Sequence, residues 1–203
     1  HGQALSPIVM DRLHTLEREL GRLRTAMRAT EVPLAQTWYA SGMRSLGQED
    51  PLEAKRRFAL AVQADTSYAP ALLRLAVFQI GEMQWQEALR SIRRLVLSDH
   101  PAAPALLDSL SPVLFAGLRR MQDQELHSET VDLTSRLLQF IPSRHPAAGI
   151  LHNVRRRSRD AILTAYATVA ERARQEGQAG LAARYESTAL EQGRQWAAED
   201  SLY

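Results

Sequence analysis

The pentapeptide Ala-Pro-Ala-Leu-Leu stands at residues 69–73 and again at residues 103–107, an offset of 34 positions. Other residues repeat at this offset of 34: Glu53-Ala54 with Glu87-Ala88, Arg56 with Arg90, Val62 with Val96, and Asp65 with Asp99. A fixed period of this length is typical of stacked helical hairpins, each of which buries an apolar face against its neighbour. The repeat therefore predicts an all-α solenoid.

The repeating unit resembles that of the tetratricopeptide (TPR) family, whose pattern runs W-x2-L-G-x2-Y, then A-x3-F, then P. In the first repeat, Trp38 and Gly42 stand in the first helix, and Ala54 and Phe58 in the second. The second repeat places these residues at equivalent positions: Leu72, Leu75, Ala76, Ala88 and Ile92. Small residues at such positions let two helices approach closely. The resemblance implies a TPR-like α-solenoid of three to four helical hairpins with an extra N-terminal helix.

Helix-start and helix-stop signals divide the chain into three parts. Residues 1–32 form a capping or coiled-coil helix, residues 33–142 form the TPR-like hairpins, and residues 143–203 form a long helix and a degenerate C-terminal hairpin. We expect helices at 7–28, at 33–47, from 51, at 69–82, at 85–98, from 101 with a kink or restart near 112, from 128 to before 142, at 146–176, and after 180.

The N-terminal helix carries apolar residues that alternate four and three positions apart: Val9, Leu13, Leu16, Leu20, Leu23 and Met27. Such spacing forms the seam of a coiled coil over nearly three heptads, although Gly21 weakens the helix. Two interpretations stay open. The seam either docks on the first hairpin as a cap, or joins two copies of the chain as a homodimer through residues 7–28.

In the TPR family, the first helix of each hairpin lines a concave groove. The positions that the resemblance assigns to this groove are Gln36, Tyr39, Met43, Leu46, Pro70, Leu73, Val77, Ile80 and Leu107. Tyr39 and Met43 replace the Lys and Asn with which co-chaperone TPR domains bind a terminal carboxylate, and only Arg74 matches that site in part. A largely apolar groove suits an amphipathic helix or an apolar peptide. Alternatively, the chain's own C-terminal helices fill it.

The resemblance and the groove together predict a non-enzymatic TPR adaptor or scaffold that binds a protein segment. The alternative function is a structural subunit of an assembly, which self-associates through the N-terminal heptad helix. The densest positive cluster comprises Arg155, Arg156, Arg157 and Arg159. Because successive helical residues point in different directions, these arginines wrap the helix. They form either a solvated, ion-paired face or a contact for phosphate or an acidic partner.

Composition narrows the remaining functions. The chain has 203 residues, no cysteine and a net charge of +2, and its one lysine, Lys55, accompanies many arginines in a bacterial-like, GC-rich pattern. A nucleic-acid partner is not expected without basic charge gathered on one surface. No apolar run approaches the ~18 residues needed to span a membrane. The histidines lack metal-ligand spacing, and no catalytic constellation appears, so we expect no enzyme activity, cofactor or metal.

The chain starts with His1 instead of Met. We therefore expect a processed chain or a residual tag, with the protein either cytoplasmic or, after removal of a signal peptide, periplasmic or secreted.

Overall fold

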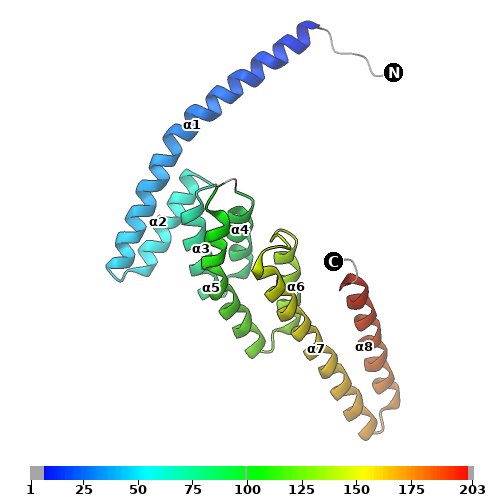
Figure 1. Ribbon diagram of the computed structural model, residues 1–203. Coiled ribbons are helices and arrows are strands. Elements are labelled where there is room, and N and C mark those ends of the chain that lie inside the picture. Colours follow the sequence, from blue (N-terminus) through cyan, green and yellow to red (C-terminus); the bar gives the residue numbers. More distant parts are fainter. Residues whose placement is uncertain (1–6, 99, 201–203) are drawn as a thin grey trace. The chain divides into compact units, whose positions relative to one another are not determined.

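The computed structural model describes residues 7–98 and 100–200, and within these ranges the chain is all-helical, without strands (Figure 1). The helices are α1 (Pro7–Gly47), α2 (Pro51–Ala64), α3 (Ala69–Gly81), α4 (Trp85–Val96), α5 (Ala103–Asp123), α6 (His127–Leu138), α7 (Pro146–Gln175) and α8 (Ala179–Asp200). The chain forms two compact units, residues 1–110 and 111–203, which are described separately below. The all-α prediction is confirmed.

Two helices begin at the prolines where the sequence predicts a start, each after a capping side chain. The Asp50 side chain accepts a hydrogen bond of 3.0 Å from the backbone N–H of Glu53, and Pro51 is the first residue of α2. At α7, His145 Nδ1 accepts a bond of 3.2 Å from the backbone N–H of Ala147, and Pro146 is the first helical residue. A cap followed by proline satisfies an unpaired amide and fixes the first helical φ angle, so each helix begins where the sequence predicts.

The turns inside the hairpins share one backbone conformation. Glu49, Met83, Glu125 and Gly177 have positive φ angles of 58°, 60°, 60° and 76°. In each case the next residue donates its N–H to the carbonyl five positions earlier, at 3.0, 2.8, 2.9 and 2.8 Å respectively. In such a helix ending, a residue in the left-handed conformation allows the next backbone N–H to donate a hydrogen bond to a carbonyl of the last helical turn. The chain therefore reverses in the same way after α1, α3, α5 and α7.

Two expected helix breaks are absent from the structure. α1 is one helix of 41 residues with Pro33 inside it, so the predicted break between residues 28 and 33 is wrong. α5 likewise continues through Pro112, so a restart there is wrong, while the alternative of a kink stays a prediction. A proline removes one backbone hydrogen bond and strains the preceding turn. Both prolines are exposed, and Thr37 Oγ1 donates to the Pro33 carbonyl at 2.9 Å, one turn further on. The loss of one backbone hydrogen bond at a proline is therefore not enough to end either helix.

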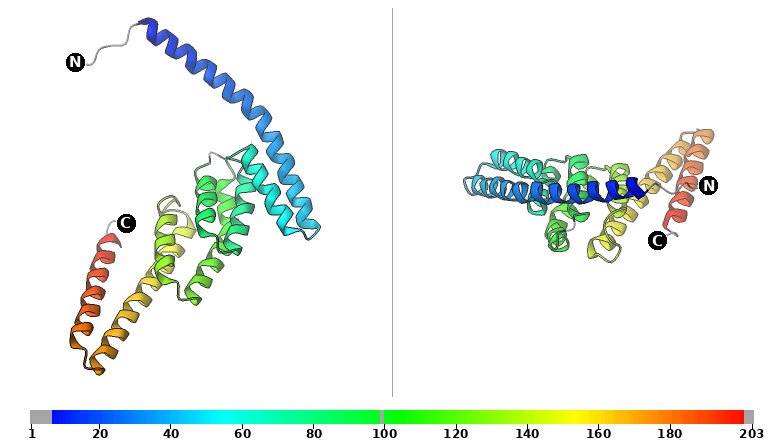
Figure 2. Two further views of the ribbon diagram at one scale, coloured as in Figure 1. Left: turned by 180° about the vertical axis from the view of Figure 1, so that it is seen from behind. Right: turned by 90° about the horizontal axis from the view of Figure 1, so that it is seen from above.

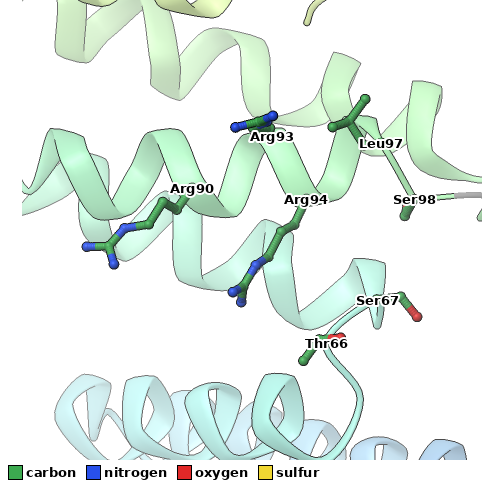
Figure 3. A pocket seen from close by; sticks show the side chains of 7 residues that line it. All are labelled: Thr66, Ser67, Arg90, Arg93, Arg94, Leu97 and Ser98. Carbon is green, nitrogen blue, oxygen red and sulfur yellow. The ribbon is translucent and has the colours of Figure 1, made fainter.

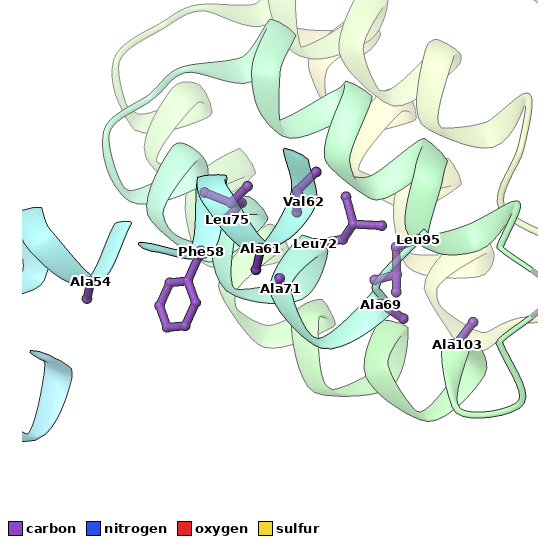
Figure 4. Close-up of a cluster of buried hydrophobic side chains, with 10 residues drawn as sticks. All are labelled: Ala54, Phe58, Ala61, Val62, Ala69, Ala71, Leu72, Leu75, Leu95 and Ala103. Atoms are coloured by element: carbon purple, nitrogen blue, oxygen red, sulfur yellow. The ribbon is translucent and has the colours of Figure 1, made fainter. Parts of the chain in front are cut away.

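The core of the first unit confirms the small residues predicted at helix crossings. Ala54 and Ala88 have no exposed surface. A Cβ atom built on Gly42 would lie 2.7 Å from the ring of Phe58, which is itself fully buried. α1 and α2 therefore touch at a glycine. Figure 4 shows the cluster around Phe58, whose members are Ala54, Phe58, Ala61, Val62, Ala69, Ala71, Leu72, Leu75, Leu95 and Ala103.

In the second unit, α6 and α8 each pack against α7. Leu118, Leu137 and Leu151 are fully buried. Some of the unit's buried polar groups are bonded: Thr134 Oγ1 donates to the Thr130 carbonyl at 2.7 Å, and Gln122 Nε2 donates to Ser158 Oγ at 2.9 Å. These bonds remove the cost of burying polar groups without partners.

Candidate functional site

The α1 side of the predicted groove is apolar and half-buried. Tyr39, Met43 and Leu46 lie on the last turns of α1 and pack against the cluster around Phe58. The Tyr39 ring lies 5.5 Å from the Phe58 ring and 5.7 Å from the Tyr68 ring. Burial, followed by the neighbouring Tyr39 and Asp65, raises the pKa of the Tyr68 hydroxyl. Tyr68 therefore stays neutral at neutral pH, and this end of the surface carries no phenolate charge.

The residues assigned to the α3 side of the predicted groove are apolar and half-buried as well. Leu73 is half-buried and packs on the same cluster, while Pro70 and Val77 are also half-buried. Phe78, which the repeat register did not assign to the groove, packs against Phe58 with ring centroids 6.2 Å apart. Gln36 is exposed. Side chains from two helices that are not adjacent in sequence thus share one core while keeping part of their surface accessible.

Two of the residues assigned to the groove are core residues instead. Ile80 is 1% exposed and Leu107 is 2% exposed, so neither can contact a partner. The resemblance to the TPR family predicts which helix face carries a side chain. Whether that face is exposed depends on how the neighbouring helices pack. The other assigned residues keep part of their surface accessible, and the groove that they would form stays a prediction: Gln36, Tyr39, Met43, Leu46, Pro70, Leu73 and Val77.

Arg74 adds a polar group beside this apolar surface. Its Nε atom is buried and has no hydrogen-bond partner among the residues that the structure describes. Arg74 lies four positions after Pro70 and three before Val77, so the three share one face of α3. A buried donor without an acceptor is costly.

The predicted basic cluster on α7 is divided between the interior and the surface. Arg155 is 6% exposed and Arg159 is 4% exposed, whereas Arg156 and Arg157 are exposed. Arg155 and Arg159 are ion-paired, as one of the two interpretations expected, but they are buried and not solvated. Their ion pairs lie within the second unit, and only Arg156 and Arg157 remain for an external contact.

The acids that pair with the buried arginines come from the end of α8. Asp200 Oδ1 accepts hydrogen bonds from Arg155 at 2.8 Å and from Arg159 at 2.9 Å, and Glu199 pairs with Arg159. The Arg159 guanidinium also lies 5.1 Å from the ring centroid of Trp196. Cation–π contact and paired acids together compensate for the burial of positive charge. These contacts stabilise the packing of α8 against α7.

His152 lies beside this cluster, with its Nδ1 atom 3.2 Å from an Arg155 nitrogen. Burial and then the positive charge of Arg155 lower the pKa of His152, although Asp200 acts in the opposite direction. The histidine is therefore neutral at neutral pH. An open pocket of about 310 Å³ is lined by His152, Asn153, Arg155, Arg156 and Asp200.

A second basic site lies on the first unit, at residues that the sequence prediction did not include. Figure 3 shows an open pocket of about 400 Å³, lined by Thr66, Ser67, Arg90, Arg93, Arg94, Leu97 and Ser98. Arg90 pairs with Glu87 at 2.7 Å, whereas Arg93 and Arg94 form no ion pair with another described residue. Three arginines spaced i, i+3 and i+4 share one helix face. That spacing was the signal available in the sequence.

Within the described residues, no group of three or more His, Asp or Glu side chains could hold a metal ion. The described helices include none that is long and apolar enough to cross a membrane. Comparisons of the chain with models of protein families, with curated proteins and with solved structures find no match.

Proposed function

We propose that this protein is a non-enzymatic adaptor built from TPR-like hairpins, which binds an apolar helical segment of another protein along α1 and α3. The observation that carries the proposal is the shared apolar surface of Tyr39, Met43 and Leu73, which rests on one core cluster and stays partly accessible. An amphipathic helix recognises such a surface through side chains at i, i+3, i+4 and i+7.

The TPR-like assignment is supported by features that recur at the repeat spacing. Glu49 and Met83, which are 34 positions apart, have the same positive φ angle within 2° and the same backbone bond in the turn. Gly42 and Phe58 occupy the small and large positions of one helix crossing, as the family pattern requires. Equivalent turns and crossings would stack successive first helices on one side, which is where the proposed groove lies.

Arg74 adds specificity to this proposal. The half-buried Arg74 side chain lies on the face of α3 that also carries Pro70 and Val77. We therefore expect the bound segment to be apolar along one stripe and to carry one acidic or amide side chain opposite Arg74. Such a mainly apolar contact depends weakly on salt, whereas an arginine-driven contact weakens steeply as salt increases.

A displayed library of random helical peptides tests the proposal and does not require the natural partner. Peptides selected on the full chain should show apolar residues in an i, i+3, i+4 pattern and should retain binding at high salt. Val77→Glu should abolish their binding, and Arg74→Ala should weaken it, with both variants checked for unchanged helicity by circular dichroism.

Two control variants distinguish binding in the groove from a nonspecific charge effect and from binding at the basic cluster on α7. Gln63→Glu introduces the same charge at an exposed position of α2 and should leave peptide binding unchanged. Replacing Arg156 and Arg157 by Ser removes the exposed part of the basic cluster on α7 and should also leave binding unchanged. Selected peptides that are acidic, sensitive to salt and lost only with the α7 variant would contradict the groove proposal.

A further inference from the structure

The N-terminal part of α1 presents a row of exposed leucines. Leu16, Leu20 and Leu23 are 58%, 52% and 63% exposed. Figures 1 and 2 show this part of α1 continuing beyond α2, with no other helix of the first unit beside it. The capping interpretation required the first hairpin to cover these leucines. The first unit leaves them exposed. Large leucines repeated at helical spacing on an uncovered face are unusual for a surface helix and indicate a partner surface.

The spacing of the apolar residues sets a heptad register along α1. Residues at position a are Leu13, Leu20 and Met27, and residues at position d are Val9, Leu16 and Leu23. The side chains of Val9, Arg12, Leu13, Arg24 and Met27 lie outside the described part of the structure, so their register comes from the sequence. Gly21 falls at position b, away from the seam, so it weakens the helix without interrupting the apolar row. The register ends before Pro33, whose missing N–H and bulky ring are unsuited to a continuous seam.

We infer that α1 joins two copies of this chain in a parallel, in-register coiled coil over residues 9–27. The charged residues beside the seam support this arrangement. Position g holds Arg12 and Glu19, and position e holds Glu17 and Arg24. In a parallel pair, position g of one helix faces the e residue five positions later in the other. Arg12 then faces Glu17 of the second copy, and Glu19 faces Arg24 of the second copy.

The antiparallel alternative places like charges together. With full overlap of the seam, Val9 of one copy lies opposite Met27 of the other. Residues whose numbers add to about 36 then lie close across the pair, which brings Glu17 near Glu17 of the second copy and Glu19 near Glu19 of the second copy. Like charges at flanking positions oppose pairing, and complementary charges set partner choice and orientation. The charge pattern therefore favours the parallel arrangement.

The continuity of α1 removes the main objection to so short a coiled coil. Helices of three heptads are marginal in isolation because starting a helix is unfavourable. Here the C-terminal part of α1 is already fixed against α2, with Ala35 fully buried and Gly42 against Phe58. The N-terminal part extends from a formed helix. This self-association is independent of peptide binding in the groove, because the two use different stretches of α1.

Sedimentation equilibrium of the full chain at several concentrations tests the inference. The wild-type chain should approach twice its monomer mass as concentration rises, while Leu16→Glu with Leu23→Glu should stay monomeric with unchanged helicity. Replacing both Glu17 and Glu19 by Arg makes the flanks wholly basic, and replacing both Arg12 and Arg24 by Glu makes them wholly acidic. Each of these variants should be monomeric alone, and an equimolar mixture should form the dimer.

Orientation is tested by disulfide formation, because the chain has no cysteine of its own. Leu23→Cys places a thiol at a seam position that meets itself only in a parallel, in-register pair. It should form a covalent dimer on mild oxidation. Arg22→Cys, at outward position c, is the matched control and should remain largely monomeric.

Three results would overturn the inference: a wild-type chain that is monomeric at every concentration, a dimer that survives both leucine substitutions, or equal cross-linking at residues 22 and 23. A particle of three or four chains would also exclude the two-stranded arrangement. Peptide binding is measured separately on the wild-type chain and on the leucine variant. If the chain does not dimerise but still binds the selected peptides, this inference fails and the groove proposal stands. If it dimerises but binds no peptide, the groove proposal fails alone.

Discussion

Replacing Gly42 by alanine tests the closest helix contact of the first unit. The added Cβ would lie 2.7, 2.9 and 3.1 Å from three atoms of the Phe58 ring. Carbon atoms in favourable contact are about 3.5–4.0 Å apart, so the nearest contact is short by about 0.8 Å. The ring cannot move away freely, because Phe58 is fully buried between Tyr39 and Phe78. The helix crossing must therefore open.

Two opposing effects decide the magnitude for Gly42→Ala. Alanine favours a helix over glycine by about 1 kcal/mol, whereas overpacking a core costs about 1–3 kcal/mol. Because three ring atoms are crowded at once, we expect overpacking to prevail and the free energy of unfolding to fall by about 1–2 kcal/mol. Gly47→Ala, in the same helix with no atom within 4 Å of its new Cβ, should be neutral or stabilising by up to about 1 kcal/mol.

Urea denaturation followed by circular dichroism at fixed protein concentration measures both variants. A double-mutant cycle with Phe58→Leu isolates the clash, because the smaller side chain leaves room for the new methyl group. Gly42→Ala should cost less in the Phe58→Leu background than in the wild type. A Gly42→Ala protein as stable as Gly47→Ala, or a cycle without coupling, would refute the close contact and the crossing built on it.

Two further predictions concern the second unit. Gly177 has a φ angle of 76°, so Gly177→Ala should lower the free energy of unfolding by about 1 kcal/mol. Gly180 has neither a positive φ angle nor a close neighbour, so Gly180→Ala should not lower it. Equal effects of the two substitutions in denaturant unfolding would contradict the turn geometry. Burial and Arg155 lower the folded-state pKa of His152, so its contribution to stability is complete above the unfolded pKa of about 6.5 and is lost as pH falls through the folded pKa. The melting temperature of His152→Gln should decline less than that of the wild type between about pH 7.5 and pH 5, and parallel curves would show that the histidine is not linked to folding.

Local signals in the sequence predicted much of the helix pattern because they act over a few residues. Asp50-Pro51 and His145-Pro146 start helices where expected, since caps and first-turn prolines satisfy local amides. The same locality explains the failures at Pro33 and Pro112. A proline is an ambiguous signal: it starts a helix when the preceding residue caps it, and it is tolerated inside when flanking turns hold the helix. Only the packing on both sides separates these cases.

Positions of the candidate site were harder to predict because they depend on residues distant in sequence. Arg155 and Arg159 are buried by pairing with Glu199 and Asp200, which lie 40 or more positions away. Nothing near these arginines in the sequence indicates such partners. Ile80 is buried as well, and the repeat register alone does not report how neighbouring helices cover a position. Tyr39 and Leu73, which are 34 positions apart, are both half-buried, and their place in a groove stays a prediction.

The continuity of α1 connects the two proposals in a way that can be measured. One helix, Pro7–Gly47, carries the leucine row at its N-terminal end and Tyr39 and Met43 at its C-terminal end. A parallel dimer would then join two grooves through a common coiled coil, and a target with two copies of the bound segment could engage both. Linked binding of this kind can exceed single-site affinity by about 10²–10⁴ without any new contact. We therefore expect a tandem peptide to bind the wild-type chain more tightly than the single peptide. The leucine variant should lose that gain while keeping the single-peptide affinity. Equal affinity of the wild-type chain for single and tandem peptides, over a series of linker lengths, would show that the two grooves do not act together.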